Sequence, residues 1–415
     1  MSDGREASIH DAGQKIARPE AEGRPVVLQL LPDFAPGALP RHAVEIAAAV
    51  SAGGGTPLVA SGGGGLEYAL GRAGAAHLTL PLASRNLLTI RRNATRLCEI
   101  VEQYDVDILH AHAPAPGWCA QIAAERSGRH FVSTIHAPYV GERGLKRKFN
   151  AVMTKAERVI AVSDFIAAHI RTNFQIDTAR LRSIPLGVDF TNYDPEHVSA
   201  ERVIKLAGEW RLPDGVPVVM LPAAFRRGNG QMRLIEAAAQ LGAEHDFCCL
   251  LLGSEGEPPP YKHDLEAQVQ RHGLAGRVLI ADTCNDMPAA FMLADVVVSA
   301  PVEPEGFDLT ISQAQALGRP VVALRDGSAP EQILDGHTGF LVQPRTSEAL
   351  AEGIRRALEL TGEARAVMSY AAIGHVRSHF SLEKTTGAIV GLYRELLRSD
   401  AYRTARQIPS GIHGA

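Results

Sequence analysis

Short aliphatic runs alternate with helix-like stretches in two successive sets along this sequence. This alternation restricts the fold more than any other feature. The first set begins at Val26 and predicts strands at 26–31, 57–60, 77–80, 108–110, 131–135 and 159–162, with helices at 40–52 and 86–103. Alternation at this spacing is typical of βαβ units, in which helices cover both faces of a parallel sheet. The first half of the chain is therefore predicted to form a doubly wound domain.

The same alternation begins again after residues 185–189. The second set predicts strands at 216–221, 248–252, 278–281, 296–299 and 321–324, with helices beginning near Gln231, Pro260, Met287 and Leu309. A length of 415 residues also exceeds what one hydrophobic core usually supports. The predicted fold class is α/β, with two facing Rossmann-like, doubly wound parallel-sheet domains. Because ligands of such sheets bind beyond the carboxyl ends of the strands, we expect an interdomain cleft.

These patterns also predict the limits of the domains. The expected segments are a disordered tail at 1–24, an N-terminal Rossmann-like domain at 25–188, a C-terminal Rossmann-like domain at 189–380, a C-terminal helix at 381–398 that packs back on the N-terminal domain, and a flexible tail at 399–415.

Charge and composition exclude several classes of protein. A net charge of -4 gives no general attraction for nucleic acid, so no nucleic-acid partner is expected. The first 25 or so residues lack the apolar centre of a secretion signal, and no apolar run reaches the roughly 18 residues of a membrane span, so we expect a cytoplasmic protein. The five cysteines form no C-x-x-C pair and no cluster with metal-ligand spacing, so no metal is expected. No G-x-G-x-x-G opens a helix after the first predicted strand, and no other cofactor is expected either.

The segment 304–323 is the part of the sequence that most directly indicates chemistry. It places the carboxylate of Glu305 directly before Gly306, and a helix is predicted to begin at Asp308 or Leu309 and to end at Gly318. Helix N-termini present unpaired N–H groups and a positive dipole end, which suit a diphosphate. We therefore expect Glu305 to face a ligand site at the start of this helix.

This segment resembles the retaining glycosyltransferases of family 4, which share the two-domain GT-B architecture. The family signature is Glu-Gly-Phe-Gly-Leu, a second Glu with Ala, and a Gly-x-Pro-Val-Val-Ala strand. This chain matches it at Glu305, Gly306, Phe307, Leu309, Ala314, Gly318 and 320–323, and the similarity extends through 161–163, 184–189 and 336–342. The resemblance thus covers nearly the whole chain from Val26 to about Leu397.

The resemblance implies an acceptor-side first domain and a nucleotide-sugar-binding second domain. Glu305 would lie near the donor sugar hydroxyls and act as a catalytic residue. The position that binds the ribose diol holds Gln313, an amide in place of the family's carboxylate. Because charge-assisted hydrogen bonds are roughly twice as strong as neutral ones, Gln313 is expected to bind less firmly.

A second departure concerns the cations that neutralise the donor diphosphate as it leaves. Ala224 replaces the family's Arg, and Asn229 replaces its Lys. Losing one such donor typically costs about 3 kcal/mol of transition-state stabilisation. Arg226 and Arg227 are close enough in sequence to take over this role.

The first domain contributes the remaining expected site residues. The family's Gly-Gly after the first strand is Gly37-Ala38 here, which narrows the approach of backbone to ligand. By resemblance, His136 lies near the donor sugar and the acceptor and is the second catalytic residue, while His112 lies on the acceptor side. The alternative for such a loop histidine is that it only caps backbone groups. The residues expected to bind the nucleotide sugar, with base contacts from loops near 253–254 and 283–287, are Gly37, Arg226, Arg227, Asn229, Gly253, Met287, Gly306, Phe307, Asp308, Leu309 and Gln313.

Two groups of basic residues indicate a further partner. The first comprises Arg85, Arg91, Arg92 and Arg96 beside Leu87 and Leu88, and the second Arg143, Lys146, Arg147, Lys148, Lys155 and Arg158. Such stripes can lie peripherally on an anionic membrane surface, here the inner membrane, where lipid-linked acceptors are found. The alternative is that both are solvated helix faces.

Three functions remain open on the sequence alone. The leading hypothesis is a hexosyltransferase that moves a sugar, with retention, from a nucleotide-sugar donor to a polysaccharide, lipopolysaccharide or lipid-linked glycan precursor. The alternative is a catalytically impaired, glycosyltransferase-like binding or scaffolding protein in envelope-glycan assembly, which Ala224, Asn229 and Gln313 together favour. A nucleotide-sugar epimerase or hydrolase on the same two-domain plan ranks third.

Overall fold

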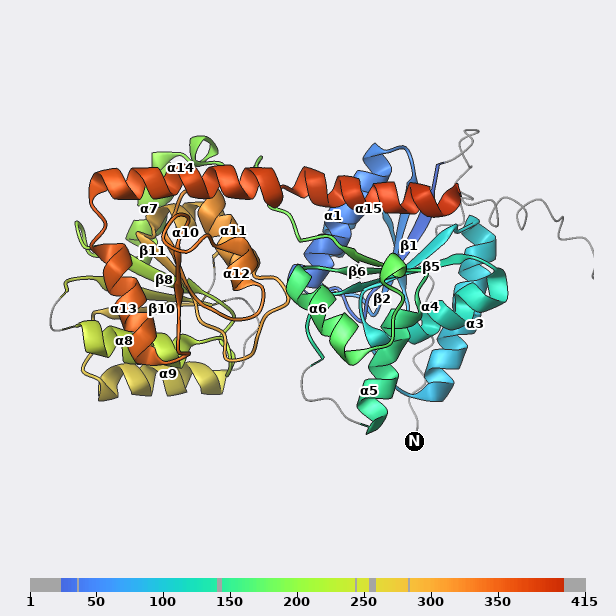
Figure 1. The fold of residues 1–415 in the computed structure, drawn as a ribbon, viewed down its shortest axis with the longest axis horizontal. Helices are drawn as coiled ribbons and strands as arrows, with labels where there is room; N and C mark the ends of the chain where they lie inside the picture. Colours follow the sequence, from blue (N-terminus) through green and yellow to red (C-terminus); the bar gives the residue numbers. More distant parts are fainter. Residues whose placement is uncertain are drawn as a thin grey trace, which may run out of the picture. The chain divides into compact units, whose positions relative to one another are not determined.

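The computed structural model describes residues 24–35, 37–139, 144–242, 245–253, 259–282 and 284–398. The predicted tails therefore lie almost wholly outside the described residues. The chain divides into two compact units, one made of 1–185 with 385–415 and the other of 186–384 (Figure 1).

The first unit contains a seven-stranded parallel sheet in the order β3-β2-β1-β4-β5-β6-β7. Its strands are β1 Val26–Leu30, β2 Thr56–Ser61, β3 Ala76–Thr79, β4 Ile108–Ala111, β5 His130–Ile135, β6 Arg158–Ala161 and β7 Leu181–Ser183. The central strand β1 is buried along its whole length, and Leu28 pairs with Leu58 on one side and Leu109 on the other. This is the burial expected of a parallel strand covered on both faces.

Helices cover the sheet of the first unit. They are α1 Ala38–Ala52, α2 Glu67–Arg72, α3 Leu87–Tyr104, α4 Pro114–Ser127, α5 Gly144–Asn150, α6 Asp164–Asn173 and, from the end of the chain, α15 Leu382–Leu397, with 3-10 turns at Ala151–Lys155 and Thr178–Arg180. Figure 1 shows α15 beside α1. Ile389 and Tyr393 of α15 share a core with Val27, Ile108 and strands β5 and β6, so the last helix is an integral part of this unit from Thr385 onward.

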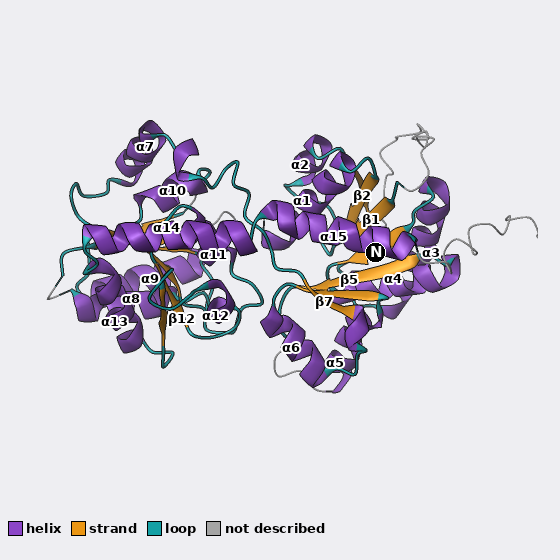
Figure 2. Cartoon of the chain, turned by 45° about the horizontal axis from the view of Figure 1, so that its top comes forward, coloured by secondary structure: helices purple, strands orange, loops and turns teal. Residues whose placement is uncertain are grey.

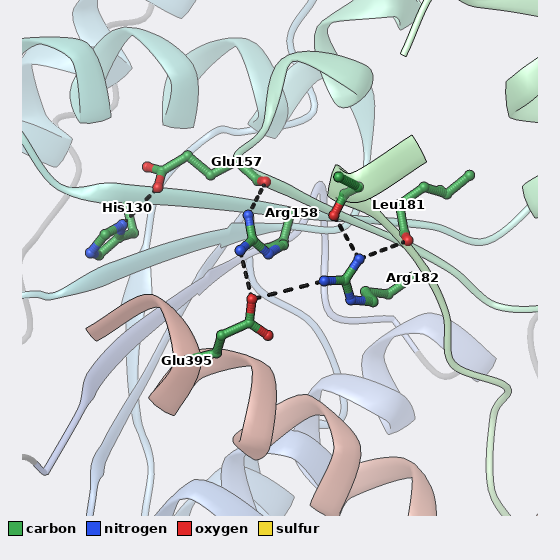
Figure 3. A network of polar contacts seen from close by, with 7 residues as sticks. His130, Glu157, Arg158, Leu181, Arg182 and Glu395 are labelled. Carbon is green, nitrogen blue, oxygen red and sulfur yellow. Dashed lines mark hydrogen bonds and ion pairs between the residues drawn. The ribbon is translucent and has the colours of Figure 1, made fainter. Parts of the chain in front are cut away.

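Ion pairs at the surface fasten α15 to the same sheet (Figure 3). The Arg158 guanidinium on β6 donates to Glu395 of α15 at 2.6 Å, and Arg182 on β7 lies 3.8 Å from the same carboxylate. Arg158 also lowers the pKa of Glu395, chiefly through this hydrogen bond. Because exposed pairs contribute about 0 to 1 kcal/mol, the apolar face of α15 carries most of its attachment.

The second unit contains a six-stranded parallel sheet in the order β10-β9-β8-β11-β12-β13. Its strands are β8 Val218–Pro222, β9 Cys248–Leu252, β10 Val278–Ala281, β11 Val296–Ser299, β12 Val321–Leu324 and β13 Phe340–Val342. Its helices are α7 Ala200–Trp210, α8 Gln231–Leu241, α9 Pro259–Arg271, α10 Met287–Leu293, α11 Leu309–Ala316, α12 Ala329–Gln332, α13 Ser347–Leu358 and α14 Gly362–His379, with a 3-10 turn at Pro195–His197. Helices α8, α9 and α13 pack together against one face of the sheet, as Figure 2 shows for this unit.

The predicted α/β fold class, with two doubly wound parallel sheets, is confirmed. The strand predicted at 216–221 begins later, at Val218, because the preceding Pro217 has no N–H to donate to a ladder. The edge strands β7 and β13 were not predicted, since three residues are too few to show a period. Among the described helices, none is long and apolar enough to cross a membrane.

Candidate functional site

A pocket of about 190 Å³ lies in the second unit, at the carboxyl ends of β8 and β11 and the start of α11. Its lining residues come from three segments: Leu221, Pro222, Ala223, Ala224 and Asn229; Val298, Ser299, Ala300 and Pro301; and Glu305, Asp308 and Thr310. This is the end of a parallel sheet at which ligands bind in doubly wound folds.

Two glycines permit the close backbone approaches that shape this pocket. Gly327 has φ +56°, and a Cβ there would lie 2.6 Å from the Glu305 carbonyl oxygen. Gly230 has φ +88°, and its Cβ would lie 2.2 Å from the Ala300 carbonyl oxygen. Any side chain at either position would displace a wall of the pocket.

Asp308 is the N-cap of helix α11. Its carboxylate accepts a hydrogen bond from the Thr310 N–H at 2.9 Å and another from the Ser299 hydroxyl at the end of β11. An acidic cap satisfies a free N–H group and suits the positive end of the helix dipole. The chain's own carboxylate thus occupies the helix end that the sequence predicted to hold a diphosphate.

The carboxyl groups of Glu305 and Asp308 interact with each other. Glu305 borders the pocket and is exposed as a whole residue, but burial around its carboxyl group and the Asp308 carboxylate raise the pKa of Glu305 to about 8. Burial also raises the pKa of Asp308, against the opposing effect of its Ser299 hydrogen bond. Two close carboxylates disfavour double ionisation, so we infer that the pair retains one proton near neutral pH.

Neutral side chains stand at the two positions where the sequence resemblance led us to expect cations in relatives. Ala224 and Asn229 both line the pocket, and the Asn229 amide donates to the Ala224 carbonyl at 2.9 Å. None of the described residues that line the pocket is Lys or Arg. A diphosphate in this pocket would therefore meet the carboxyl groups of Glu305 and Asp308 and no side-chain cation among the described lining residues.

The two arginines predicted to compensate lie outside this lining. Arg227 forms an ion pair with Asp264 of α9 and lies over the ring of Tyr261, with 5.4 Å between its guanidinium carbon and the ring centroid. Arg226 is exposed, and its N–H donates to the Ala224 carbonyl at 2.7 Å. The backbone of Arg226 therefore adjoins the pocket, whereas the side chain of Arg227 is held by α9.

The other predicted residues of the second unit surround the same sheet end. Gly306 and Phe307 are buried, and the Phe307 ring packs edge-on against Phe380 at 5.5 Å between centroids. Leu309 and Gln313 lie on α11 and are half-buried.

The residues predicted to contact the nucleotide base lie at the ends of other strands and helices of the second unit. Gly253 follows β9, where an added Cβ would lie 2.4 Å from the Phe225 ring. Met287 is the first residue of α10, whose N-cap Asp286 is held by two hydrogen bonds from Arg202, at 2.6 and 2.7 Å. Ser254 and Thr283, also predicted near the base, lie outside the described residues.

The first unit brings four histidines together at the carboxyl ends of β4 and β5. They are His42 on α1, His110 on β4, His112 after β4 and His136 after β5. His112 Nδ1 lies 3.2 Å from His136 Nε2, and the His42 and His136 rings meet edge-on at 5.7 Å between centroids. The predicted residues His112 and His136 are therefore direct neighbours.

Burial keeps three of these histidines neutral. It lowers the pKa of His110 to about 3, and it lowers the pKa of His112 and His136 well below the usual range, with a further contribution from the neighbouring imidazoles. His110 bonds to Tyr393 of α15 at 2.6 Å and to Thr134 at 2.7 Å. His110 is thus a satisfied core residue at the end of a buried strand.

Sequence reasoning missed Gln29 and His42, which are 1% and 2% exposed. Gln29 interrupts an aliphatic strand, and a polar residue in such a run is a signal that could have identified it. Gly37 is the exposed N-cap of α1 with an extended φ of 170°, a conformation open to other residues. Among the residues that the structure describes, no group of three or more His, Cys, Asp or Glu side chains could hold a metal ion.

Both halves of the chain match models of glycosyltransferase families. The family model described as "Glycosyltransferase Family 4" matches residues 39–192, and the model described as "Glycosyl transferases group 1" matches residues 204–375. The D-inositol 3-phosphate glycosyltransferase of Actinosynnema mirum is 27% identical over 326 residues, which cover 71% of this chain and 75% of that protein.

Solved structures share the fold over nearly the whole chain. A glycosyltransferase from Rickettsia africae superposes with a TM-score of 0.84 at 29% identity, covering 91% of this chain and 99% of its own. Alr3699/HepE of Anabaena, solved in complex with UDP-glucose, superposes with a TM-score of 0.77 at 22% identity, covering 89% and 99% of the two chains.

Proposed function

Because this chain belongs to glycosyltransferase family 4 and has the GT-B fold, we propose that it transfers a hexose from a nucleoside-diphosphate sugar to a hydroxyl group of a glycan or lipid-linked precursor. The observation that carries the proposal is the pocket of the second unit, where Glu305 and the start of α11 meet the ends of β8 and β11. A nucleotide-bound relative of the same fold supports this choice of donor class.

The proposed reaction proceeds with retention of configuration. The acceptor hydroxyl oxygen bonds to the anomeric carbon on the face that the diphosphate leaves, and the bond from that carbon to the diphosphate oxygen breaks. The hydroxyl proton passes to the departing diphosphate, so the products are a glycoside and a nucleoside diphosphate. The protein's part is to position both substrates and to stabilise the developing charge.

Glu305 is suited to hold the donor sugar in this reaction. Its raised pKa leaves the carboxyl largely protonated near neutral pH, so that it can both donate to and accept from sugar hydroxyls. A neutral carboxyl also avoids repelling the nearby diphosphate. Gln313 lies on α11 and is half-buried, and it is the proposed contact to the ribose diol of the nucleotide.

Arg226 is the proposed source of positive charge for the leaving diphosphate. It follows the pocket-lining Ala224 by two residues, it is exposed, and its backbone N–H donates to the Ala224 carbonyl at 2.7 Å. The side chain of Arg227 is held at α9 by Asp264 and Tyr261. Arg226→Ala should therefore weaken nucleoside-diphosphate binding about tenfold or more, in line with the loss of one charge-assisted contact. Arg227→Ala, the matched control, should leave binding within about twofold of wild type.

A second candidate function follows from the charge of the pocket. Two carboxyl groups and no Lys or Arg among the described lining residues favour a glycosyltransferase-like protein that binds or scaffolds without turnover. Such a protein would serve envelope-glycan assembly through its surface rather than through this pocket.

Thermal stabilisation separates the two candidates. The folded protein is heated with UDP, GDP, ADP and their common sugar conjugates. A nucleotide at about a hundred times its dissociation constant adds about 2.7 kcal/mol of stability, which is an easily measured shift. If the protein is a transferase, we expect a shift with the sugar conjugate of one nucleotide, which Glu305→Ala should reduce and Glu303→Ala, outside the pocket lining, should preserve. No shift with any of them in a folded sample would favour the binding protein.

Peripheral contact with an anionic membrane surface completes the proposal. The start of α3 exposes Leu87 and Leu88, at 69% and 74%, next to four exposed arginines: Arg85, Arg91, Arg92 and Arg96. Exposed leucines flanked by arginines suit insertion at an anionic lipid interface, where a lipid-linked acceptor resides.

The second basic group is less available for such a contact. Arg158 pairs with Glu395, Arg147 lies over the Phe174 ring, and Lys155 lies over the Trp118 ring. Arg143 lies outside the described residues. The proposed membrane surface is therefore the start of α3.

A further inference from the structure

A chain of hydrogen bonds, buried at Gln29 and part-buried at its end, runs through the histidine cluster of the first unit and ends on His136. We propose that Gln29, acting through His112, fixes the tautomer of His136, so that His136 presents an unprotonated Nδ1 that accepts a hydrogen bond from a ligand hydroxyl. The assignment of a ligand to His136 rests on the proposed function, whereas the tautomer itself does not.

The first step is the orientation of the Gln29 amide. Gln29 lies on β1 and is 1% exposed. One end of its amide lies 2.9 Å from the Ala43 carbonyl oxygen on α1, and the other lies 3.0 Å from His112 Nε2. A carbonyl oxygen can only accept, so the amide nitrogen must face Ala43. The amide oxygen of Gln29 therefore faces His112.

The second step is the protonation of His112. Because the Gln29 oxygen is an acceptor, His112 Nε2 must carry the hydrogen. His112 is 3% exposed, and burial together with the neighbouring imidazoles lowers its pKa well below the usual range. A neutral imidazole has one hydrogen only, so His112 Nδ1 carries a lone pair.

The third step transfers this constraint to His136. His112 Nδ1 lies 3.2 Å from His136 Nε2, so the latter must donate. Burial also lowers the pKa of His136, chiefly by desolvation and then by repulsion from His42 and His110. His136 is thus neutral with its hydrogen on Nε2. Among the residues that the structure describes, none hydrogen-bonds to His136 Nδ1, and the residue is only half-buried.

The consequence is a preference between ligand groups. An unprotonated Nδ1 accepts from a hydroxyl, which can donate, and repels an ionised phosphate oxygen, which cannot. His136 therefore recognises a hydroxyl of a sugar or of an acceptor alcohol. Gln29 is a positioning residue, since it acts on the ligand only through His112 and His136.

Long-range ¹H–¹⁵N correlation spectra of the histidine side chains in the full chain, without ligand, test this directly. The expected result for wild type is a single neutral His136 tautomer with hydrogen on Nε2. A wild-type His136 that carries its hydrogen on Nδ1, or that is charged at neutral pH, overturns the proposal without needing any variant.

Variants then test the role of Gln29. Gln29→Met has a similar length but no polar group, so both His136 tautomers should appear. An even mixture would raise the apparent KM for the hydroxyl-bearing substrate about twofold, because half of the molecules are competent. Persistence of the wild-type tautomer in a folded Gln29→Met sample also contradicts the proposal.

A matched control uses another buried hydrogen bond of the histidine cluster. Thr134→Val removes the hydroxyl that bonds to His110 Nε2 at 2.7 Å, which lies outside the chain from Gln29 to His136. The His136 tautomer should not change in this variant. Because the spectra are recorded without substrate, failure of the transferase proposal and failure of the tautomer proposal give different results.

Discussion

Replacing Asp308 by Asn should tighten the binding of nucleoside diphosphates. Asp308 caps α11 and contributes charge to a pocket that lacks Lys and Arg among its described lining residues. A pocket of 190 Å³ is about 7 Å across if treated as a sphere, and two unit charges at that separation repel by about 2 kcal/mol at an effective dielectric constant near 20. Removing the charge should therefore lower the dissociation constant roughly thirtyfold.

The substitution is chosen to leave the helix cap in place. Asn is about as good an N-cap as Asp, so the Thr310 N–H keeps its acceptor. Loss of the favourable charge at the helix dipole costs about 0.3 to 1 kcal/mol of folding free energy, and relief of the repulsion from Glu305 offsets part of it. The melting temperature without ligand should change little.

Isothermal titration calorimetry with UDP, GDP and ADP measures the effect. The preferred nucleotide should bind Asp308→Asn more tightly than wild type, and the gain should shrink as salt concentration rises. The corresponding uncharged nucleosides should bind both proteins equally. Equal affinity of the two proteins for every nucleoside diphosphate, or weaker binding by Asp308→Asn, would show that Asp308 does not oppose the diphosphate.

Three further predictions concern stability and membrane binding. The raised pKa of Glu305 means that the folded state holds this proton more firmly than the unfolded state, so the contribution of Glu305 to stability should decline as pH rises from about 4.5 to 8. Urea titrations should show this decline in wild type but not in Glu305→Gln, and the same pH dependence in both proteins would contradict the raised pKa. Tyr393→Phe removes the hydroxyl that bonds to buried His110 at 2.6 Å, so denaturant titration should show a loss of about 1 to 3 kcal/mol of unfolding free energy. A loss near zero would mean that another group hydrogen-bonds to His110 Nδ1 in the variant. Replacing Leu87 and Leu88 together by Ser should reduce cosedimentation with phosphatidylglycerol vesicles and leave the low binding to phosphatidylcholine vesicles unchanged. Equal binding of wild type and variant to phosphatidylglycerol would show that the start of α3 is not the membrane-binding surface.

The sequence predicted the strands and helices that have a clear period. The strand at 248–252 and the helix starts at Met287 and Leu309 agree with the structure to the residue. Strand order and register were not predictable, because pairing depends on contacts between residues far apart in sequence. The pairing of β1 with both β2 and β4 is an example.

The candidate site was predictable only where the chemistry is local. Asp308 could be named because a helix N-terminus shows in the sequence, but its bond to Ser299 depends on how β11 and α11 pack. The pairing of Arg227 with Asp264 removes from the pocket a cation that sequence distance alone had placed near it. Gln29 gave only a weak signal, because its role arises where β1, α1 and the end of β4 converge.

Sugar transfer to an acceptor is the reaction on which the proposed function depends. The purified protein is incubated with the nucleotide sugar that stabilises it and with candidate hydroxyl acceptors, and the release of nucleoside diphosphate and the formation of glycoside are followed together. We predict equal amounts of the two products, retained anomeric configuration, and loss of both products in Glu305→Ala but not in Glu303→Ala. Release of free sugar or of an isomer without acceptor, or a folded protein that binds the nucleotide sugar without any turnover, would contradict it.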